Sequence, residues 1–506
     1  MLQHQGRNDT DPAGAVRYLT TGDPHFEYLF GGPGAKGIYT ATPPGGTSVL
    51  IEGFSGTGKT ILACQLCTQS LRANWPQGGA GIVYTLDQSP DDLRSLIARF
   101  RWLPEDCVEE IPFEQDVGRV PTTNMRLFLK AVPSEQTLAD LWQRILRDCV
   151  STRDDRAGDQ GLRVVVVDAI NTLLRLRDTA IDYDAQFRKL VKTCHEFNLI
   201  EILTLEKVSG NPALEEYVPS CVIELKRTGE IGAERALEVL KARNQAHFIG
   251  AHDFTIISGV GIHVLPSLQA RSEGVERPDP AKRKPSNPIN FGFQLIDDAI
   301  APGLEEDSTT LLWGPPGMHK TELCAMFLAE GLHKEPRSRA LFITFKIEPA
   351  AFLALLDERD RSKPGGTSGF VERTDVIMAR DPFELPTAVY TRIKEKVEGS
   401  EASRDQGLIR RAGVFGLQRL TQLPAFQRRN WEFLEVLVSY LQSHHISTLL
   451  IDWPEPNPQG AVVVPRAIDL CSNEFEMRRD GAEGRLRVYI KRQNYQVVGK
   501  SVDYPE

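Results

Sequence analysis

Two similar segments, each an apolar run followed by a turn of small residues and a Lys-Thr pair, most constrain how this chain can fold. Residues 47–67 read TSVLIEGFSGTGKTILACQLC, and residues 308–328 read STTLLWGPPGMHKTELCAMFL. The lysines of the two turns, Lys59 and Lys320, lie 320 − 59 = 261 residues apart, so the repeated unit is a whole domain. We therefore predict two related domains, each built around a strand, a tight turn and a helix.

The stretch between the repeats has the composition of a linker. Residues 267–288 read SLQARSEGVERPDPAKRKPSNP, dense in proline and charge. We expect a first domain over residues 1–266 and a second over residues 289–506. A chain of 506 residues that is 41% hydrophobic and 25% charged can bury an adequate core in each domain without disulfides.

Apolar strands alternate with helical segments in the first repeat. Ser89, followed by Pro90 and two aspartates, predicts an N-cap and the first turn of a helix. This alternation predicts an α/β fold in which each domain is a mainly parallel sheet flanked by helices. The expected strands of the first domain are residues 48–52, 81–86, 163–167 and 201–205.

Charge and cysteine content narrow the possible settings. The 59 Lys and Arg against 68 Asp and Glu give a net charge of −9, which repels polyanions and disfavours a DNA-binding interpretation. The cysteines have no disulfide or ligand spacing, as is typical of a reducing compartment, and Cys64 and Cys67 are expected to pack inside a helix. Because the N-terminus lacks a leader-like apolar core and apolar runs are strand-sized, we expect a cytoplasmic protein without membrane contact.

The first turn, residues 53–60, matches the G-x-x-x-x-G-K-[ST] pattern of a P-loop between a strand and a helix. Lys59 is expected to hold the β and γ phosphates of a nucleoside triphosphate. The Thr60 hydroxyl is expected to ligate Mg²⁺, with Asp168 at the end of LRVVVVD as the Walker B acid. The residues expected around the nucleotide are Ser55, Gly56, Thr57, Gly58, Lys59, Thr60 and Ile61.

The second turn keeps the lysine and threonine but has His319 where the last glycine belongs. A positive φ there would cost a residue with a Cβ about 1–2 kcal/mol. Whether this loop still binds nucleotide is therefore left open, with Gly317, Lys320 and Thr321 as the candidate contacts. As its Walker B acid we expect Asp452, which ends the run ISTLLID.

Two further stretches resemble signatures of the KaiC-like ATPases, RecA-type proteins with two such domains in tandem. Thr85-Leu-Asp87-Gln88-Ser89-Pro90 is similar to the family's Thr-x-Glu-Glu-Thr-Pro, and residues 237–250 are similar to its Lys-x-Arg-x-x-x-His-x-x-Gly. The resemblance covers most of residues 17–266 and, more loosely, residues 287–500. It implies two tandem RecA-like P-loop domains, ATP and Mg²⁺ as cofactors, and a homo-oligomer in the form of a hexameric ring.

The resemblance also implies an ATP site shared between subunits, with Lys241 and Arg243 reaching the phosphates of the neighbouring chain. If only the alternation of polar and apolar residues is considered, the alternative is that both side chains simply lie on an exposed strand edge. Asp87 stands where the family has a catalytic glutamate, and its shorter side chain predicts slow hydrolysis. The residues expected near the ribose or base are Arg99, Gln245 and His247.

The second domain departs further from the family. It has Lys346 where the first domain has Asp87, and aligning Arg492 with Arg243 leaves Ile490 opposite Lys241. Residues 460–465 contain no hydroxyl where the family's clock protein is autophosphorylated, so we expect no autokinase. These changes predict a second domain that serves assembly or partner binding.

Three functions stay open at this point. The first is an ATP-dependent assembly switch with slow turnover and a protein partner. The second is a RecA-type DNA-dependent ATPase or recombination accessory factor. The third is a scaffold that binds ATP without hydrolysing it.

Overall fold

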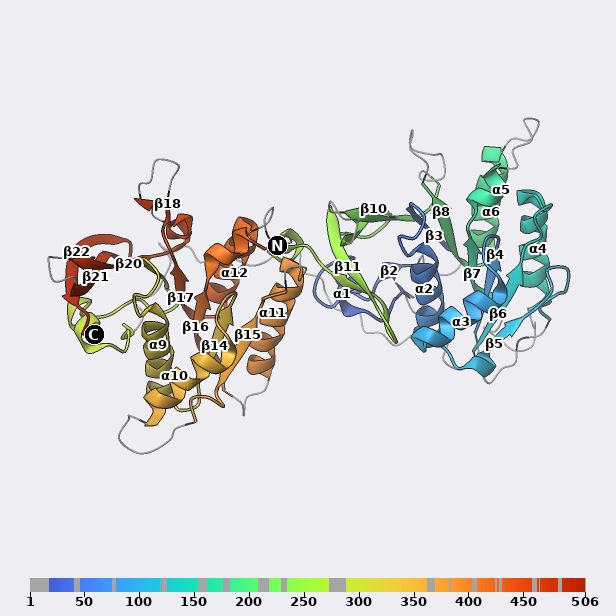
Figure 1. Cartoon of the computed structure of the whole chain (residues 1–506). Coiled ribbons are helices and arrows are strands. Elements are labelled where there is room, and N and C mark those ends of the chain that lie inside the picture. Colours follow the sequence, from blue (N-terminus) through green and yellow to red (C-terminus); the bar gives the residue numbers. More distant parts are fainter. Residues whose placement is uncertain are drawn as a thin grey trace. The chain divides into compact units, whose positions relative to one another are not determined.

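The chain divides into two units, Met1–Ala270 and Arg271–Glu506, which Figure 1 draws in one sequence-coloured ribbon. The structure is a computed structural model. It describes residues 18–40, 46–74, 79–118, 120, 125–152, 162–175, 183–207, 218–228, 234–272, 288–361, 369–381, 384–402, 407–423, 426, 430–456, 462–463, 465–480 and 485–505.

A ten-stranded sheet forms the centre of the first unit, in the order β12-β11-β10-β9-β3-β8-β7-β4-β6-β5. The strands from β9 to β5 are parallel, and β10, β11 and β12 extend the sheet antiparallel beyond β9. The strands are β3 (Thr47–Gly53), β4 (Ala80–Thr85), β5 (Val108–Glu110), β6 (Arg126–Ala131), β7 (Leu162–Asp168), β8 (Ile200–Glu206), β9 (Cys221–Thr228), β10 (Glu234–Ala242), β11 (Ala251–Ile257) and β12 (Gly261–Leu265), with a separate pair of β1 (Tyr18–Leu19) and β2 (Ile38–Tyr39). The helices are α1 (Pro24–Tyr28), α2 (Lys59–Asn74), α3 (Pro90–Phe100), α4 (Leu138–Ser151), α5 (Asn171–Arg175), α6 (Tyr183–Glu196) and α7 (Leu268–Ser272).

The second unit has an eight-stranded sheet in the order β15-β14-β16-β17-β13-β20-β21-β22. Its strands are parallel from β15 to β20, and β21 and β22 continue antiparallel. The strands are β13 (Thr309–Trp313), β14 (Arg339–Thr344), β15 (Thr374–Met378), β16 (Ile409–Phe415), β17 (Ser447–Asp452), β20 (Asn473–Asp480), β21 (Arg485–Gln493) and β22 (Gln496–Asp503), with a separate pair of β18 (Glu455–Pro456) and β19 (Val462–Val463). The helices are α8 (Gln294–Ala299), α9 (Lys320–Lys334), α10 (Pro349–Arg361), α11 (Pro386–Ala402) and α12 (Asn430–Ser443).

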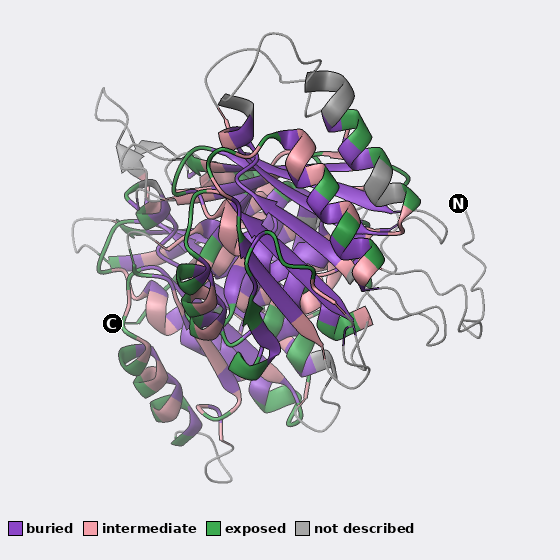
Figure 2. Ribbon diagram, turned by 90° about the vertical axis from the view of Figure 1, so that its right-hand side faces the viewer, coloured by how far each residue is buried: buried purple, intermediate pink, exposed green. Residues whose placement is uncertain are grey.

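The two units confirm the predicted α/β class of parallel sheets flanked by helices. The four strands expected in the first domain are present as β3, β4, β7 and β8. Ser89 is the N-cap of α3, and its hydroxyl accepts from the backbone N–H of Asp92. In Figure 2 the strands are buried while the helices around them carry exposed faces, the pattern of a layered α/β core. None of the described helices is long and apolar enough to cross a membrane.

The structure differs from the predicted linker at the start of that segment. Residues 268–272 form α7, in which Leu268 and Ala270 are buried. The hydroxyl of Tyr28 donates to the carbonyl oxygen of Ala270 at 3.1 Å. The sequence analysis assigned these residues to the linker because two buried apolar residues hardly change the average composition of a segment of 22 residues.

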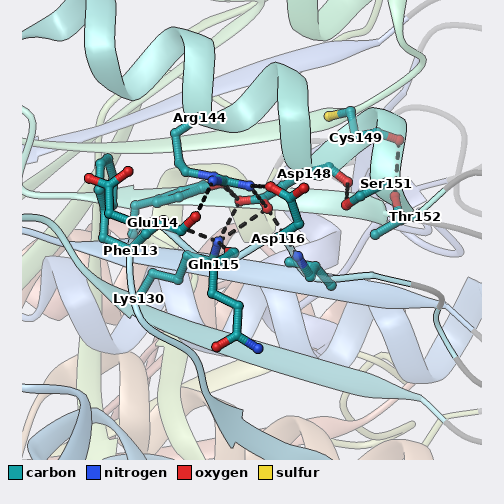
Figure 3. A network of polar contacts seen from close by, with 12 residues as sticks. Phe113, Glu114, Gln115, Asp116, Lys130, Arg144, Asp148, Cys149, Ser151 and Thr152 are labelled. Atoms are coloured by element: carbon teal, nitrogen blue, oxygen red, sulfur yellow. Dashed lines mark hydrogen bonds and ion pairs between the residues drawn. The ribbon is translucent and has the colours of Figure 1, made fainter.

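A buried ion cluster, shown in Figure 3, fastens α4 to the outer strands of the first sheet. Asp148 of α4 accepts from Lys130 of β6 at 2.9 Å and from the Tyr84 hydroxyl of β4 at 2.5 Å. Arg144, one turn earlier on α4, donates to Asp148 at 2.6 Å and also pairs with Asp116. The side chains of Lys130 and Asp148 are both fully buried, and burial lowers the pKa of Lys130.

Replacing the shared carboxylate should destabilise the first unit strongly. Asp148→Ala leaves Lys130 buried without its counter-ion, so we expect the free energy of unfolding to fall by about 3–5 kcal/mol. Urea unfolding of the full chain, followed by circular dichroism, measures this. Asp140→Ala removes only a capping-box carboxylate at the start of α4 and should cost about 1 kcal/mol. Equal losses in the two variants would contradict the stabilising role of the cluster.

Candidate functional site

The first P-loop turns between β3 and α2 with glycines in backbone conformations that other residues rarely adopt. Gly53 and Gly56 have φ angles of 153° and 72°. A Cβ on Gly53 would lie 2.3 Å from the carbonyl oxygen of Leu225. Of the other predicted loop contacts, Ser55 is exposed, and Thr57 is buried with its hydroxyl donating to the loop backbone at 2.8 Å. The loop thereby turns its backbone at the N-terminus of α2, where N–H groups bind phosphate.

Lys59 is subject to the charges of three carboxylates. Its Nζ donates to two carbonyl oxygens of the loop, both at 2.9 Å. Burial lowers the pKa of Lys59, and the carboxylates of Glu206, Asp168 and Asp87 partly oppose that shift. Glu206, at the end of β8, was missed by the sequence analysis. The signal that could have found it is an acid closing the apolar run IEILTLE.

Thr60 and Asp168 lie together as predicted for a metal site. The Thr60 hydroxyl is 3.0 Å from Oδ2 of Asp168, and the Thr204 hydroxyl donates to the same carboxylate. Burial raises the pKa of Asp168, so its carboxylate lacks full compensation for its charge. Hydroxyl and carboxylate oxygens are the ligands that Mg²⁺ prefers. The residues present therefore fit Mg²⁺, held by Thr60 and Asp168 and charge-balanced by the nearby acids.

Asp87 is exposed at the turn between β4 and α3, where a bound phosphate or water can reach it. The Thr172 hydroxyl donates to its Oδ1 at 2.5 Å and fixes the carboxylate. Gln88 stabilises the turn through its backbone. Its N–H donates to the Thr85 hydroxyl, and its carbonyl oxygen accepts from the same hydroxyl. Arg99 lies exposed in the last turn of α3.

Lys241 and Arg243 lie toward the other end of the sheet from their own P-loop. Lys241 of β10 pairs with Val222 of β9, which pairs with Leu50, 53 − 50 = 3 residues before the loop begins. At about 3.3 Å per residue, the Lys241 backbone is roughly 10 Å along the strands from the loop. Arg243 follows the end of β10 and is exposed. The structure therefore does not bring this pair to the phosphates of its own domain.

The predicted base-side residues have structural contacts of their own. The Gln245 side chain accepts from the backbone N–H of Tyr39 and so holds the β1–β2 pair. His247 is half-buried, and burial lowers its pKa. A residue that the sequence analysis missed contacts the loop instead: Arg227 of β9 donates to the carbonyl oxygen of Gly56 at 3.0 Å. Its signal was a basic residue near the end of the strand CVIELKRT.

The second P-loop keeps the backbone form of the first. Gly314 and Gly317 have φ angles of 154° and 74°. His319, which stands in place of the last glycine, has a φ of 52° and so adopts the positive φ considered in the sequence analysis. Lys320 donates to the Gly314 carbonyl oxygen at 2.7 Å, as Lys59 does in the first loop. The His319 ring pairs with Glu322 and stacks on Tyr504 at 5.6 Å between centroids.

The sheet order contradicts the prediction that Asp452 is the counterpart of Asp168. Asp168 ends β7 and pairs with Thr85 of β4. In the second sheet the strand beside β14 is β16, and the residue that pairs with Thr344 is Phe415. Asp452 ends β17, directly beside the loop strand β13, where the first sheet has β8. An apolar run that ends in aspartate does not reveal which strands it pairs with, and only the sheet order does.

The predicted alignment of Arg492 with Arg243 is also wrong. In the first sheet Leu50 of β3 is level with Lys241 of β10, with one strand between them. In the second sheet the equivalent residue of β13, Leu311, is level with Arg492 of β21, again with one strand between them. Arg492 therefore takes the position of Lys241. Its guanidinium donates to two backbone carbonyl oxygens at 2.8 Å. One arginine common to both segments was not enough to align the two strands. Each strand pair contains a bulge, which shifts the alignment of residues along the strand.

The stretch in which no autokinase hydroxyl was expected, residues 460–465, is only partly described. Its positions 460, 461 and 464 lie outside the described part of the chain. That expectation therefore stays a prediction from the sequence.

The first unit has the order of strand, P-loop and helix, with an acid at the end of a strand two places away in the parallel sheet. This arrangement is that of a RecA-like P-loop domain. Residues 33–269 match the family of ATPases described as KaiC. The first unit is thus similar to the KaiC-like ATPases over most of its length.

Two relatives show the extent of the similarity. The chain is 27% identical over 316 residues to circadian clock oscillator protein KaiC 1 of Synechocystis sp., a match over 60% of this chain and 54% of that protein. It is 25% identical over 487 residues to circadian clock oscillator protein KaiC of Prochlorococcus marinus subsp. pastoris, covering 88% of this chain and 86% of that protein. The matched stretch thus spans about half of the first relative and most of the second.

Burial of Lys320 makes a testable contribution to stability. Its side chain is 4% exposed, and burial lowers its pKa to about 7. The unfolded chain holds this proton up to about pH 10, so the charge penalty is full below pH 7 and is relieved as the pH rises toward 10. Lys320→Met should raise the free energy of unfolding at pH 7 by about 1–3 kcal/mol, with a smaller gain at pH 9.

Urea unfolding at both pH values measures this difference. Lys334→Met, at the exposed end of the same helix, is the control and should change stability little at either pH. A Lys320→Met variant that is less stable than the parent at pH 7 would contradict the buried-charge penalty.

Proposed function

We propose that this protein is an ATP-dependent assembly switch, in which slow hydrolysis at the first P-loop changes the association of the chains. The observation that carries the proposal is the cluster of Lys59, Thr60 and Asp168, with Asp87 and Glu206 beside the same lysine. This set supplies a phosphate cation, an oxygen-donor metal site and a carboxylate that can orient water. Bound Mg²⁺ would supply charge neutralisation for the phosphates.

Asp87 is the proposed base for the attacking water. The Thr172 bond orients its carboxylate, which is exposed and so accessible to water. Aspartate reaches one methylene less far than glutamate, and proton transfer depends on hydrogen-bond distance. We therefore propose that turnover is slow.

Lys241 and Arg243 are proposed to complete the site of a neighbouring copy. Their place away from their own loop is in keeping with a role toward a second chain packed against the sheet. A cation supplied by a neighbour couples nucleotide state to assembly, because the site is complete only when the chains are correctly packed. A homo-oligomeric ring meets this requirement. A ring in a reducing, cytoplasmic setting is in keeping with the buried free cysteines.

Two other functions remain distinguishable by experiment. A DNA-dependent ATPase would bind DNA with an affinity that falls steeply with salt, against which the net charge of −9 argues. A non-hydrolysing scaffold would be purified with ATP, rather than ADP, at the first loop.

Removal of the proposed base should abolish turnover while binding survives. We expect Asp87→Asn to lower the rate of phosphate release by about 10²-fold or more, with ATP affinity changed little. Asp91→Asn, an acid in the first turn of α3, is the matched control and should keep the parental rate. Phosphate release by Asp87→Asn at the parental rate would contradict the assignment.

Mixed oligomers test the shared site. Lys59→Ala chains lose the loop lysine, and Lys241→Ala/Arg243→Ala chains lose the groups for the neighbour, so each variant alone should be inactive. Co-expressed at equal amounts, they form some interfaces that combine intact halves, and about a quarter of the parental ATPase rate should return. Mass measurements with ATP, with ADP and without nucleotide establish whether assembly follows ATP. An active Lys241→Ala/Arg243→Ala chain, or a mixture that stays inactive, would refute sharing.

A further inference from the structure

The second P-loop has exchanged the groups around its lysine while keeping its backbone. Thr344 repeats the contacts of Thr85: its hydroxyl bonds with the backbone N–H and carbonyl oxygen three residues later. Lys346 therefore occupies the position of Asp87, two residues after the threonine in each turn. Phe415 occupies the position of Asp168.

The third acid is replaced as well. Gly53 of the first loop pairs with Glu206 of β8. In the second sheet Trp313 pairs with Asp452, so the next residue, Trp453, lies level with the start of the loop. The three carboxylates that surround Lys59 thus become a lysine, a phenylalanine and a tryptophan.

The new groups gather at one aromatic ring. Lys346 Nζ lies 4.1 Å, and Lys320 Nζ 5.5 Å, from the centre of the Trp453 ring. Phe415 packs against the same ring edge-on at 5.6 Å. Trp453 is 6% exposed, and its Nε1 is a buried donor for which the described residues provide no acceptor.

These exchanges reverse the local charge. Lys59 with its three carboxylates has a formal charge of 1 − 3 = −2, whereas Lys320 with Lys346 and Asp452 has 2 − 1 = +1 when both lysines are protonated. A nucleotide phosphate chain meets net repulsion at the first loop unless a divalent cation is bound, and net attraction at the second without one. Phe415 offers no oxygen to a metal ion.

We propose that the second P-loop binds the phosphate chain of a nucleoside triphosphate without a divalent cation, with the Lys346 ammonium in the charge-neutralising place of Mg²⁺. The loop N–H groups and Lys320 hold the phosphates, as in a metal-dependent site. The positions of the base and of the Walker B acid are Lys346 and Phe415, so the bound nucleotide is retained unhydrolysed. This inference does not depend on hydrolysis at the first loop.

The experiment uses the full chain with Lys59→Ala, which disables the first loop, and measures ATP binding by equilibrium dialysis in EDTA. We expect about one ATP per chain, with an affinity that excess Mg²⁺ changes by less than about threefold. Absence of binding in EDTA, or binding that requires Mg²⁺, would overturn the proposal. Neither result bears on the first loop, which Lys59→Ala disables.

Variants in the same background identify the cation. Lys346→Glu should weaken binding in EDTA at least about tenfold, because it replaces an attractive charge with a repulsive one. Lys334→Glu makes the same charge change about 20 Å along α9 from Lys320 and should bind as the parent does. Lys320→Met should lose binding while remaining folded, since its stability is expected to rise. ATP bound equally well by Lys346→Glu would overturn the assigned role of Lys346.

Discussion

The parallel pairing of each loop strand with its neighbours is the constraint on which both sites depend. Parallel strands in one ladder end at the same edge of the sheet, and the helices that connect them return the chain across its faces. In the first unit this places Gly53, Glu206 and Asp168 at one edge, although more than a hundred residues separate the loop from either acid. The same ladder in the second unit brings Phe415 and Trp453 to the equivalent places.

One scaffold therefore supports two opposite electrostatic environments. The backbone of each loop is determined by its glycines and by the strand that precedes it. The local charge is determined instead by side chains at the carboxyl ends of three other strands. Exchange of those side chains leaves the ladder intact, because none of their groups takes part in its hydrogen bonds. Duplication followed by such exchange explains how the second unit keeps the form of an ATP site without the acids that hydrolysis requires.

Stability and function oppose each other at the second loop. Lys320 is buried beside another lysine, and burial disfavours its charge. A core of this kind is more stable with an apolar residue at that position. The lysine is in keeping with phosphate binding, whose negative charge offsets the penalty. At the first loop the three acids provide that compensation for Lys59 instead, and they leave a negative excess that suits a divalent cation.

The sequence by itself determined the α/β class, the first loop with Lys59 and Thr60, its repetition in the second half of the chain, and the capped start of α3, because each of these signals lies within a short continuous segment. Only the tertiary structure decided what depends on pairing between distant segments. It placed Phe415, rather than Asp452, in the Walker B position, since strand order is a property of the sheet. Glu206, Arg227 and the cluster around Asp148 escaped prediction for the same reason. Lys130 lies 18 residues from Asp148, and Arg227 lies 171 residues from Gly56, so no local pattern records these contacts.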